Sequence, residues 1–260
     1  MSSRPIKPVA LTIAGSDCSG GAGLQADLKV WSQLGVHGSS VVTCLTAQTP
    51  GFFSCLKASM PRFVEAQLDA VLSSMNVKSV KTGMLYSRPI IEIVAKQLIK
   101  LQGLKLVVDP VMISSTGTPL MRPSGVNAMM KSMLPLAKLV TPNLDEATVL
   151  TKKRIKEPED MRTAARVIHS QFGCSVLVKG GHLNTSEAID LFYDGKEEFL
   201  LSAPRKKRIS PPGTGCTYSS AISAYLAKGE SLSSAVVLAK QYMTQSFEKV
   251  YRAGKYTFLG

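Results

Sequence analysis

Short apolar runs rich in β-branched residues alternate with amphipathic runs along nearly the whole chain. The early apolar runs lack an alternation of apolar and polar positions, which is typical of strands buried on both faces of a parallel sheet. The predicted strands are Val9–Ala14, Ser40–Ala47, Ser79–Thr82, Leu104–Asp109, Leu139–Thr141, Ser175–Lys179, Ala188–Tyr193 and Glu198–Leu201.

The runs between these strands have helical spacing, and several begin with Pro or Ser and end near Gly. The predicted helices are Gly23–Leu34, Pro61–Met75, Pro89–Leu101, Ser124–Leu136, Pro158–Phe172, Cys216–Ala227 and Ser231–Val250. Asp194 and Gly195 predict the turn of a hairpin between the last two strands. We therefore expect an α/β fold, a three-layer α/β/α sandwich with a mostly parallel central sheet. Ligands of such folds bind at the carboxyl ends of the strands.

Length and composition favour a globular protein. The chain has 260 residues, 45% of them apolar, which suits one domain over residues 1–260 with a sizeable core. It has no uninterrupted apolar run of about 18 residues, so no membrane span is expected. Residues 1–8 lack the apolar segment of a secretory signal. Five scattered cysteines without a CxxC pair favour reduced thiols and a cytoplasmic location.

The net charge of +13 raises the possibility of nucleic-acid binding. The dense basic clusters are Arg205–Arg208 and Lys152–Arg154, and neither is interleaved with stacking aromatic residues. A site for anionic small molecules explains some of the positive charge, and a solvated basic surface explains the rest. We expect no nucleic-acid partner.

The segment Gly15–Gly23 (GSDCSGGAG) follows the first predicted strand and opens a helix. Its GxxxxG spacing resembles the start of a P-loop, but Gly21 stands where a P-loop has lysine, and the segment does not contain GxGxxG. Asp27, one turn into the helix, would point back toward this loop and accept hydrogen bonds from a ligand. The alternative is a glycine turn with a surface aspartate.

A second glycine segment, PGTGCT over residues 212–217, opens another helix. Glycines let successive backbone N–H groups converge, and the helix dipole adds positive potential. Gly213, Thr214 and Gly215 would thus form an anion hole for a transferring phosphoryl group. Cys216 lies in the first turn, where the helix terminus would lower the pKa of its thiol and make it a candidate general base. The alternative is a small cysteine that packs the turn.

Charged and polar residues follow several other strands. Asp109 ends a buried strand and could hold Mg²⁺ directly or through water. Glu146 could share that ion or belong only to a helix cap. Lys179 could reach a phosphate as a point charge. Gln48 offers a donor and an acceptor that complement an aminopyrimidine edge, and Met84 an apolar wall.

His182 has no visible partner, and we interpret it as structural or peripheral. Strand-end motifs that are ambiguous one by one would meet at one cleft, and together they indicate phosphate chemistry.

Seven segments in order resemble the hydroxymethylpyrimidine and phosphomethylpyrimidine kinases of thiamin biosynthesis, which belong to the ribokinase-like superfamily. They are AGSDCSGGAGLQADLK, TAQT, VKTGM, VVDPVM, TPNLDEA, VLVKGGH and GTGCT, spread between about Val9 and Leu226. The resemblance implies an α/β/α sandwich that uses ATP and Mg²⁺ to phosphorylate 4-amino-5-hydroxymethyl-2-methylpyrimidine, and then its monophosphate. A homodimer is usual among similar proteins.

The resemblance also implies roles for single residues. Gln48 would read the pyrimidine amino group, and the pocket would be lined by Gly15, Ala22, Asp27, Met84 and Val111. Asp109 and Glu146 match positions associated with Mg²⁺, and Lys179 a position that faces phosphate. Gly213, Thr214 and Gly215 would form the anion hole, with Cys216 as the catalytic thiol.

Two positions depart from the family pattern. Pro212 replaces a histidine common before GTGC, and Thr118 replaces an aspartate. These differences concern the kinetics and the second phosphorylation rather than the reaction class.

Three other functions compete with this one. A pyridoxal kinase of the same superfamily would mostly carry aspartate where Cys216 stands, although pyridoxal could be a side substrate. A silent binding protein would not need Asp109, Glu146, Lys179 and Cys216 together. A nucleic-acid binder would show salt-dependent retention on DNA.

Overall fold

The computed structural model describes residues 5–113, 119–181, 183, 185–206 and 211–260. Its main sheet has nine strands in the order β3-β2-β1-β4-β5-β6-β7-β8-β9. The strands are β1 (Val9–Asp17), β2 (His37–Thr49), β3 (Phe52–Ala58), β4 (Val77–Thr82), β5 (Leu106–Val108), β6 (Leu139–Val140), β7 (Ser175–Gly180), β8 (Glu187–Tyr193) and β9 (Glu198–Pro204). The six central strands are parallel, in the order β2-β1-β4-β5-β6-β7. At the edges, β3 pairs antiparallel with β2, β8 with β7, and β9 with β8.

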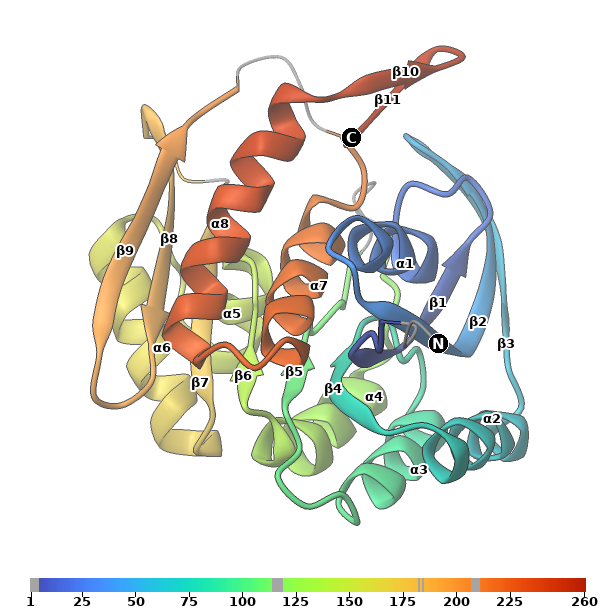
Figure 1. Cartoon of the computed structure of the whole chain (residues 1–260). Helices are drawn as coiled ribbons and strands as arrows, with labels where there is room; N and C mark the ends of the chain where they lie inside the picture. The colour runs from blue at the N-terminus through green and yellow to red at the C-terminus, as the bar shows by residue number, and fades with distance from the viewer. Residues whose placement is uncertain (1–4, 114–118, 182, 184, 207–210) are drawn as a thin grey trace.

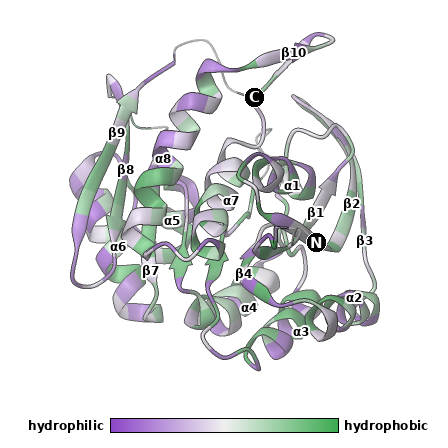
Figure 2. Ribbon diagram, in the orientation of Figure 1, coloured by the Kyte–Doolittle hydropathy of each residue, from purple (hydrophilic) through white to green (hydrophobic). Residues whose placement is uncertain are grey.

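Helices cover both faces of this sheet, so the predicted three-layer sandwich is confirmed (Figure 1). The helices are α1 (Gly23–Gln33), α2 (Pro61–Ser74), α3 (Arg88–Leu98), α4 (Pro123–Ala128), α5 (Leu144–Thr151), α6 (Pro158–Phe172), α7 (Thr214–Ala227) and α8 (Leu232–Glu248). Helices α1, α7 and α8 pack on one face around Trp31 and Ile222, and α2 to α6 pack on the other around Leu98 and Ile168. The strands between these layers are largely hydrophobic (Figure 2).

Several predicted elements are corrected by the structure. The segment expected as one helix over 124–136 consists of α4, a π-helical turn (Met129–Met133) and a 3₁₀ turn (Leu134–Leu136). Pro135 lies in the last turn, where its missing N–H cannot continue an α-helix. The hairpin turn at Asp194 and Gly195 is confirmed, because Tyr193 pairs with Glu198.

Strand β3 and a carboxyl-terminal hairpin were not predicted, and helix α5 was indicated only by the helix cap near Glu146, without bounds. The hairpin consists of β10 (Tyr251–Ala253) and β11 (Tyr256–Phe258), which form a separate two-stranded sheet. Strand β3 is a largely exposed edge strand, so its sequence lacks the apolar run that marks the buried strands. Among the described residues, no helix is long and apolar enough to cross a membrane.

Candidate active site

The parallel strands bring the chain segments after β1, β4, β5, β6 and β7 to one edge of the sheet. Strand β4 pairs with β1 and β5, and β6 pairs with β5 and β7. Asn143, after β6, also forms a bridge with Lys179 at the end of β7. The glycine loop, Met84, Asp109, Glu146 and Lys179 therefore share the edge at which the sequence predicts the ligand site.

The anion-hole segment begins helix α7 at this edge. Gly213 is the N-cap residue with φ +73°, and the helix begins at Thr214, two residues earlier than expected. A β-carbon on Gly213 would lie 2.0 Å from the carbonyl oxygen of Gly21. The first N–H groups of an α-helix have no partner within the helix, so those of Thr214, Gly215 and Cys216 remain donors for an anion.

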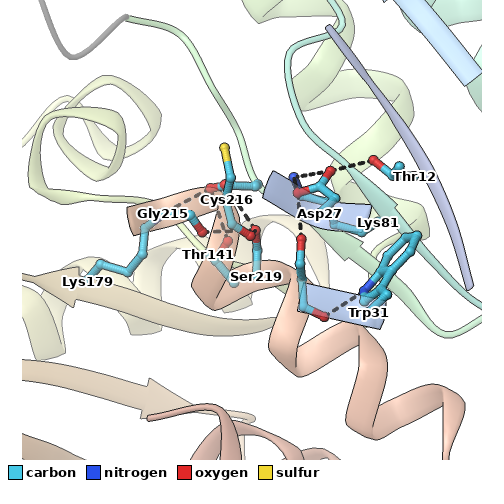
Figure 3. A network of polar contacts seen from close by, with 11 residues as sticks. Thr12, Asp27, Trp31, Lys81, Thr141, Lys179, Gly215, Cys216 and Ser219 are labelled. Atoms are coloured by element: carbon cyan, nitrogen blue, oxygen red, sulfur yellow. Dashed lines mark hydrogen bonds and ion pairs between the residues drawn. The ribbon is translucent and has the colours of Figure 1, made fainter. Parts of the chain in front are cut away.

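Asp109 and Lys179 form an ion pair directly beside this helix terminus, with 2.8 Å between Lys179 Nζ and Asp109 Oδ1 (Figure 3). Thr141 Oγ1 and Ser219 Oγ also donate to the Asp109 carboxylate, at 3.2 and 3.1 Å. A β-carbon on Gly215 would lie 3.1 Å from Lys179 Nζ. The glycine therefore allows the ammonium to approach the start of α7.

The charges of this pair support one another. Burial raises the pKa of Asp109, but the Lys179 and Lys81 ammonium groups outweigh it, and the net pKa is below its usual value. Burial lowers the pKa of Lys179, but Asp109 and Glu146 outweigh it, and the net pKa is raised. Lys179 is thus a permanent cation at the site.

Glu146 belongs to a helix cap, one of the two roles left open by the sequence. Its backbone N–H donates to Asn143 Oδ1 and its Oε2 accepts from the Asn143 N–H, both at 2.8 Å, which is a capping box at the start of α5. Burial raises the pKa of its carboxyl to about 7, Lys179 opposes this shift, and the charge of Asp109 adds to it. Capping does not exclude a second role, because Asp109 is close enough to influence Glu146.

The donor set fits a magnesium ion that is held mainly by phosphates and water. The described residues contain no group of three or more His, Cys, Asp or Glu side chains that could hold a metal. Mg²⁺ is usually bound through one or two carboxylates together with substrate phosphates and water. Asp109 and Glu146 provide that number of carboxylates and no dedicated cage.

The expected low pKa of Cys216 is wrong for the ligand-free protein. Burial raises the pKa of its thiol to about 11, and the charges of Asp27 and Asp109 add to this, while Lys81 and the Gly23 N–H lower it. Desolvation of the thiolate thus outweighs the favourable helix terminus. Cys216 does lie in the first turn of α7, as expected.

On the substrate side, Gly15, Met84 and Val111 lie together. Met84 forms a small apolar cluster with Cys44 and Leu120, and Val111 packs against it. A β-carbon on Gly15 would lie 2.7 Å from Met84 Cε and 2.8 Å from Cys44 Sγ. Three of the six residues expected to line the pocket thus form one apolar wall at the ends of β1, β4 and β5.

Gln48 and Ala22 lie at the borders of this wall. Gln48 is partly buried at the end of β2, and its backbone N–H and carbonyl contact Cys18 Sγ at 3.4 and 3.2 Å. Ala22 is the N-cap residue of α1. The structure leaves both residues at the predicted edge of the sheet.

Asp27 is placed differently from the expectation. Its carboxylate does not point toward the glycine loop but is fully buried, where it accepts from both Lys81 and two hydroxyl groups (Figure 3). Thr12 Oγ1 and Ser220 Oγ each donate to it at 2.5 Å. A carboxylate that accepts four hydrogen bonds from three protein donors and has no exposed surface is not open to a ligand in this structure.

The sequence reasoning missed Lys81 and Asp17. Lys81 is fully buried in β4 between Val80 and Thr82, and a lysine within a strand predicted to lie inside the sheet is the signal that could have indicated a buried partner. Asp17 accepts four hydrogen bonds from within the glycine loop, from Ser19 N and Oγ, Gly21 N and Ala22 N. An internal carboxylate thus occupies the concavity that a P-loop offers to phosphate.

This geometry explains the glycine loop. A β-carbon on Gly23 would lie 2.3 Å from the carbonyl oxygen of Gly15, so the loop closes tightly on itself around Asp17. The loop is a wall of the site, and the phosphate donors come from α7. His182 and Thr118 lie outside the described residues.

Comparison with known proteins decides the family. The sequence model of the phosphomethylpyrimidine kinase family matches residues 17–259. The chain belongs to the phosphomethylpyrimidine kinase family. A hydroxymethylpyrimidine/phosphomethylpyrimidine kinase of Rhizobium meliloti is 47% identical over 236 residues, which cover 90% of this chain and 88% of that protein.

Other phosphomethylpyrimidine kinase relatives are longer. The chain spans about half of a thiamine biosynthesis bifunctional protein of Geobacter sulfurreducens, 50% of its length at 44% identity over 245 residues. The similarity to that protein covers 94% of this chain. The relatives of this chain thus include a kinase of similar length and a longer bifunctional protein that contains a similar segment.

Solved structures agree with a ribokinase-like fold for this phosphomethylpyrimidine kinase relative. A phosphomethylpyrimidine kinase of Clostridium difficile superposes with a TM-score of 0.83 at 38% identity, covering 93% of this chain and all of that one. A pyridoxal kinase of Staphylococcus aureus in complex with AMP-PCP and pyridoxal gives a TM-score of 0.88 at 33% identity, covering 98% and 93%. The fold is therefore shared by pyrimidine and pyridoxal kinases.

Proposed function

We propose that this protein transfers the γ-phosphoryl group of ATP to 4-amino-5-hydroxymethyl-2-methylpyrimidine, and a second one to the resulting monophosphate, in thiamine biosynthesis. The observation that carries the proposal is the start of α7, where the free N–H groups of residues 214–216 lie beside the Asp109–Lys179 ion pair. Backbone donors beside a permanent cation suit the charge of a transferring phosphoryl group. Family membership supplies the substrate class.

The reaction is an in-line displacement. The substrate hydroxymethyl oxygen forms a bond to the γ-phosphorus while the bond from phosphorus to the β,γ-bridging oxygen breaks, and ADP leaves with that electron pair. The hydroxyl proton passes to the Cys216 thiolate, which is the proposed general base. Because the pKa of Cys216 is about 11, few molecules are ionised at neutral pH, but each thiolate is a strong base.

Charge is balanced by the protein and by Mg²⁺. The N–H groups of residues 214–216 would donate hydrogen bonds to the phosphoryl oxygens and stabilise the negative charge that spreads over them. Lys179 would neutralise the β- and γ-phosphates. Asp109 and Glu146 would hold Mg²⁺ together with the phosphates and water, and the ion would neutralise further negative charge on the phosphates. ATP as the donor is supported by the AMP-PCP complex of the Staphylococcus aureus relative.

The substrate would lie on the apolar wall of Gly15, Met84 and Val111. Gln48, at the end of β2, would bind the amino group and a ring nitrogen of the pyrimidine. Ala22 would border the ring. Asp27 would support the site from below through Lys81 and Ser220, because its carboxylate is not exposed.

A second substrate, pyridoxal, is favoured by one observation, the close superposition with the pyridoxal kinase complex of Staphylococcus aureus. Pyridoxal also carries a hydroxymethyl group on a nitrogen heteroaromatic ring. The test is ADP release with Mg-ATP and hydroxymethylpyrimidine, its monophosphate or pyridoxal, each measured separately. Turnover of both pyrimidines supports the proposal, whereas turnover of pyridoxal alone contradicts it.

The homodimer and the cytoplasmic location stay predictions. Size-exclusion chromatography with light scattering tests the first, and fractionation of cells tests the second. The proposed partners are the small-molecule substrates alone.

A further inference from the structure

The carboxyl-terminal hairpin β10–β11 contacts the glycine loop through one buried aromatic ring. Phe258 is 7% exposed, whereas all three residues of β10 are exposed. A β-carbon on Gly21 would lie 2.9 Å from Phe258 Cε1 and 2.8 Å from Pro212 Cγ. The aromatic ring and the proline ring therefore both pack on the α-carbon of Gly21.

The glycine loop also touches the anion-hole segment through the backbone. The carbonyl oxygen of Gly21 lies so close to Gly213 that a β-carbon there would be 2.0 Å away. Pro212 immediately precedes Gly213, the N-cap residue of α7. Gly21 is thus the point at which the glycine loop, the anion-hole segment and the hairpin meet.

The hairpin has a second contact at the end of β2. Tyr256 OH lies 3.3 Å from Thr49 Oγ1, and Thr49 follows Gln48, the proposed reader of the pyrimidine. The tail of the chain thus contacts two segments of the site, the glycine loop at Gly21 and the end of β2 at Thr49.

We propose that Phe258 and Tyr256 are positioning residues, which fix the glycine loop, the anion-hole segment and the end of β2 relative to one another. The proposal rests on the kinase reaction proposed above. Neither side chain is assigned a contact with substrate. Each acts through a neighbour, Phe258 through Gly21, on which Pro212 also packs, and Tyr256 through Thr49.

The physical reason is the precision that phosphoryl transfer requires. A displacement of about 1 Å of a catalytic group can reduce a rate by about 100-fold. The first hydrogen bond of helix α7 runs from the Thr217 N–H to the Gly213 carbonyl at 2.8 Å, so Pro212 lies before the first hydrogen-bonded turn. Packing of two rigid rings on Gly21 restricts this segment without adding a polar group near the phosphates. Pro212, the departure from the family pattern, thereby gains a role in packing.

The first test compares Phe258→Ala with Arg252→Ala, a change at an exposed position of the same hairpin. We expect Phe258→Ala to lower kcat by about 10-fold or more at saturating substrates, because the anion hole is displaced. Arg252→Ala should leave kcat and KM unchanged, and Phe258→Leu should restore most of kcat by restoring the apolar contact. Wild-type kcat and KM in a folded Phe258→Ala variant would overturn the proposal.

The second test uses Tyr256→Phe, which removes one hydroxyl and keeps the ring. We expect the KM for hydroxymethylpyrimidine to rise a few-fold, an increase that corresponds to about the loss of one hydrogen bond, and kcat to stay unchanged. An unchanged KM would overturn the role of Tyr256. If Phe258→Ala does not fold, Tyr256→Phe carries the test.

Hydrogen exchange separates this proposal from the proposed function. Phe258→Ala should increase amide exchange in the peptide that covers residues 211–217 relative to Arg252→Ala, whatever the substrate is. Faster exchange in Phe258→Ala, together with no turnover of either pyrimidine by the wild-type protein, would contradict the proposed function and support the positioning role. Unchanged exchange would contradict the positioning role.

Discussion

Lys81 Nζ lies 2.8 and 2.9 Å from the two carboxylate oxygens of Asp27, and neither side chain is exposed to solvent. The pair links β4 to α1, and Ser220 connects it to α7 below the anion hole. Trp31 Nε1 also donates to the carbonyl of Ser220 at 2.9 Å. Burial lowers the pKa of Lys81, but Asp27, with smaller contributions from Cys216 and Asp109, more than compensates, and the net pKa is raised. The core beneath the site therefore contains a fully buried ion pair.

Breaking this pair should destabilise the fold. Removing one partner leaves an uncompensated buried charge, so Lys81→Met or Asp27→Asn should each lower the free energy of unfolding by about 3–5 kcal/mol. Urea denaturation measures the loss. The double variant Asp27→Asn with Lys81→Met should lose less than the sum of the two single changes. Additive losses would show that the two charges do not depend on each other.

Gly213 and Gly35 provide a matched pair, because both have φ +73°. A β-carbon on Gly35 would meet no atom within 4 Å, whereas one on Gly213 would lie 2.0 Å from Gly21 O. Alanine at either position should cost about 1–2 kcal/mol of stability through backbone strain. Gly213→Ala should in addition reduce kcat by about 100-fold, because the anion-hole donors move. Equal activity of the two variants in ADP-release assays would contradict the anion-hole assignment.

Cys216 should give the reaction an alkaline dependence. If the thiolate is the base, its concentration rises with pH up to the thiol pKa of about 11. The value of kcat/KM should therefore increase about tenfold per pH unit between pH 7 and pH 9. Cys216→Ala should lower turnover by about 100-fold or more while ATP binding changes little, and its pH profile should be flat. A flat profile for the wild type would exclude Cys216 as the base.

Glu146 should make stability depend on pH. Burial raises the pKa of its carboxyl from 4.5 to about 7, so between these values the folded protein holds a proton that the unfolded chain has released. Stability should therefore be fully present below about pH 4.5 and fall with rising pH toward 7, with a slope of at most about 1.4 kcal/mol per pH unit.

The matched variant is Glu146→Gln, which keeps the shape but cannot ionise. Urea denaturation of both proteins from pH 4 to 8 gives the difference. The wild type should lose stability relative to Glu146→Gln as the pH rises. The opposite slope would contradict a raised pKa.

Strong local patterns made the layers predictable. The buried strands β1 and β4 to β7 carry short apolar runs, and the amphipathic helices carry a helical periodicity, so each is visible in the local sequence. Gly213 marks the start of α7. The edge strand β3 and the hairpin β10–β11 have mixed, exposed surfaces, so their sequences contain no comparable signal. The helix over 124–136 was expected to be regular, and Pro135 interrupts it.

The sequence by itself determined the fold class, the family and the segments that meet at the edge of the sheet, because connection order and strand direction place those segments together. Only the tertiary structure decided what each charged group faces. Asp27 and Asp17 both belong to the glycine-rich region, yet one pairs with Lys81 across the core and the other closes the loop on itself. The pKa of Cys216 was likewise decided by tertiary burial, since desolvation depends on every neighbour that excludes water and no local motif records it.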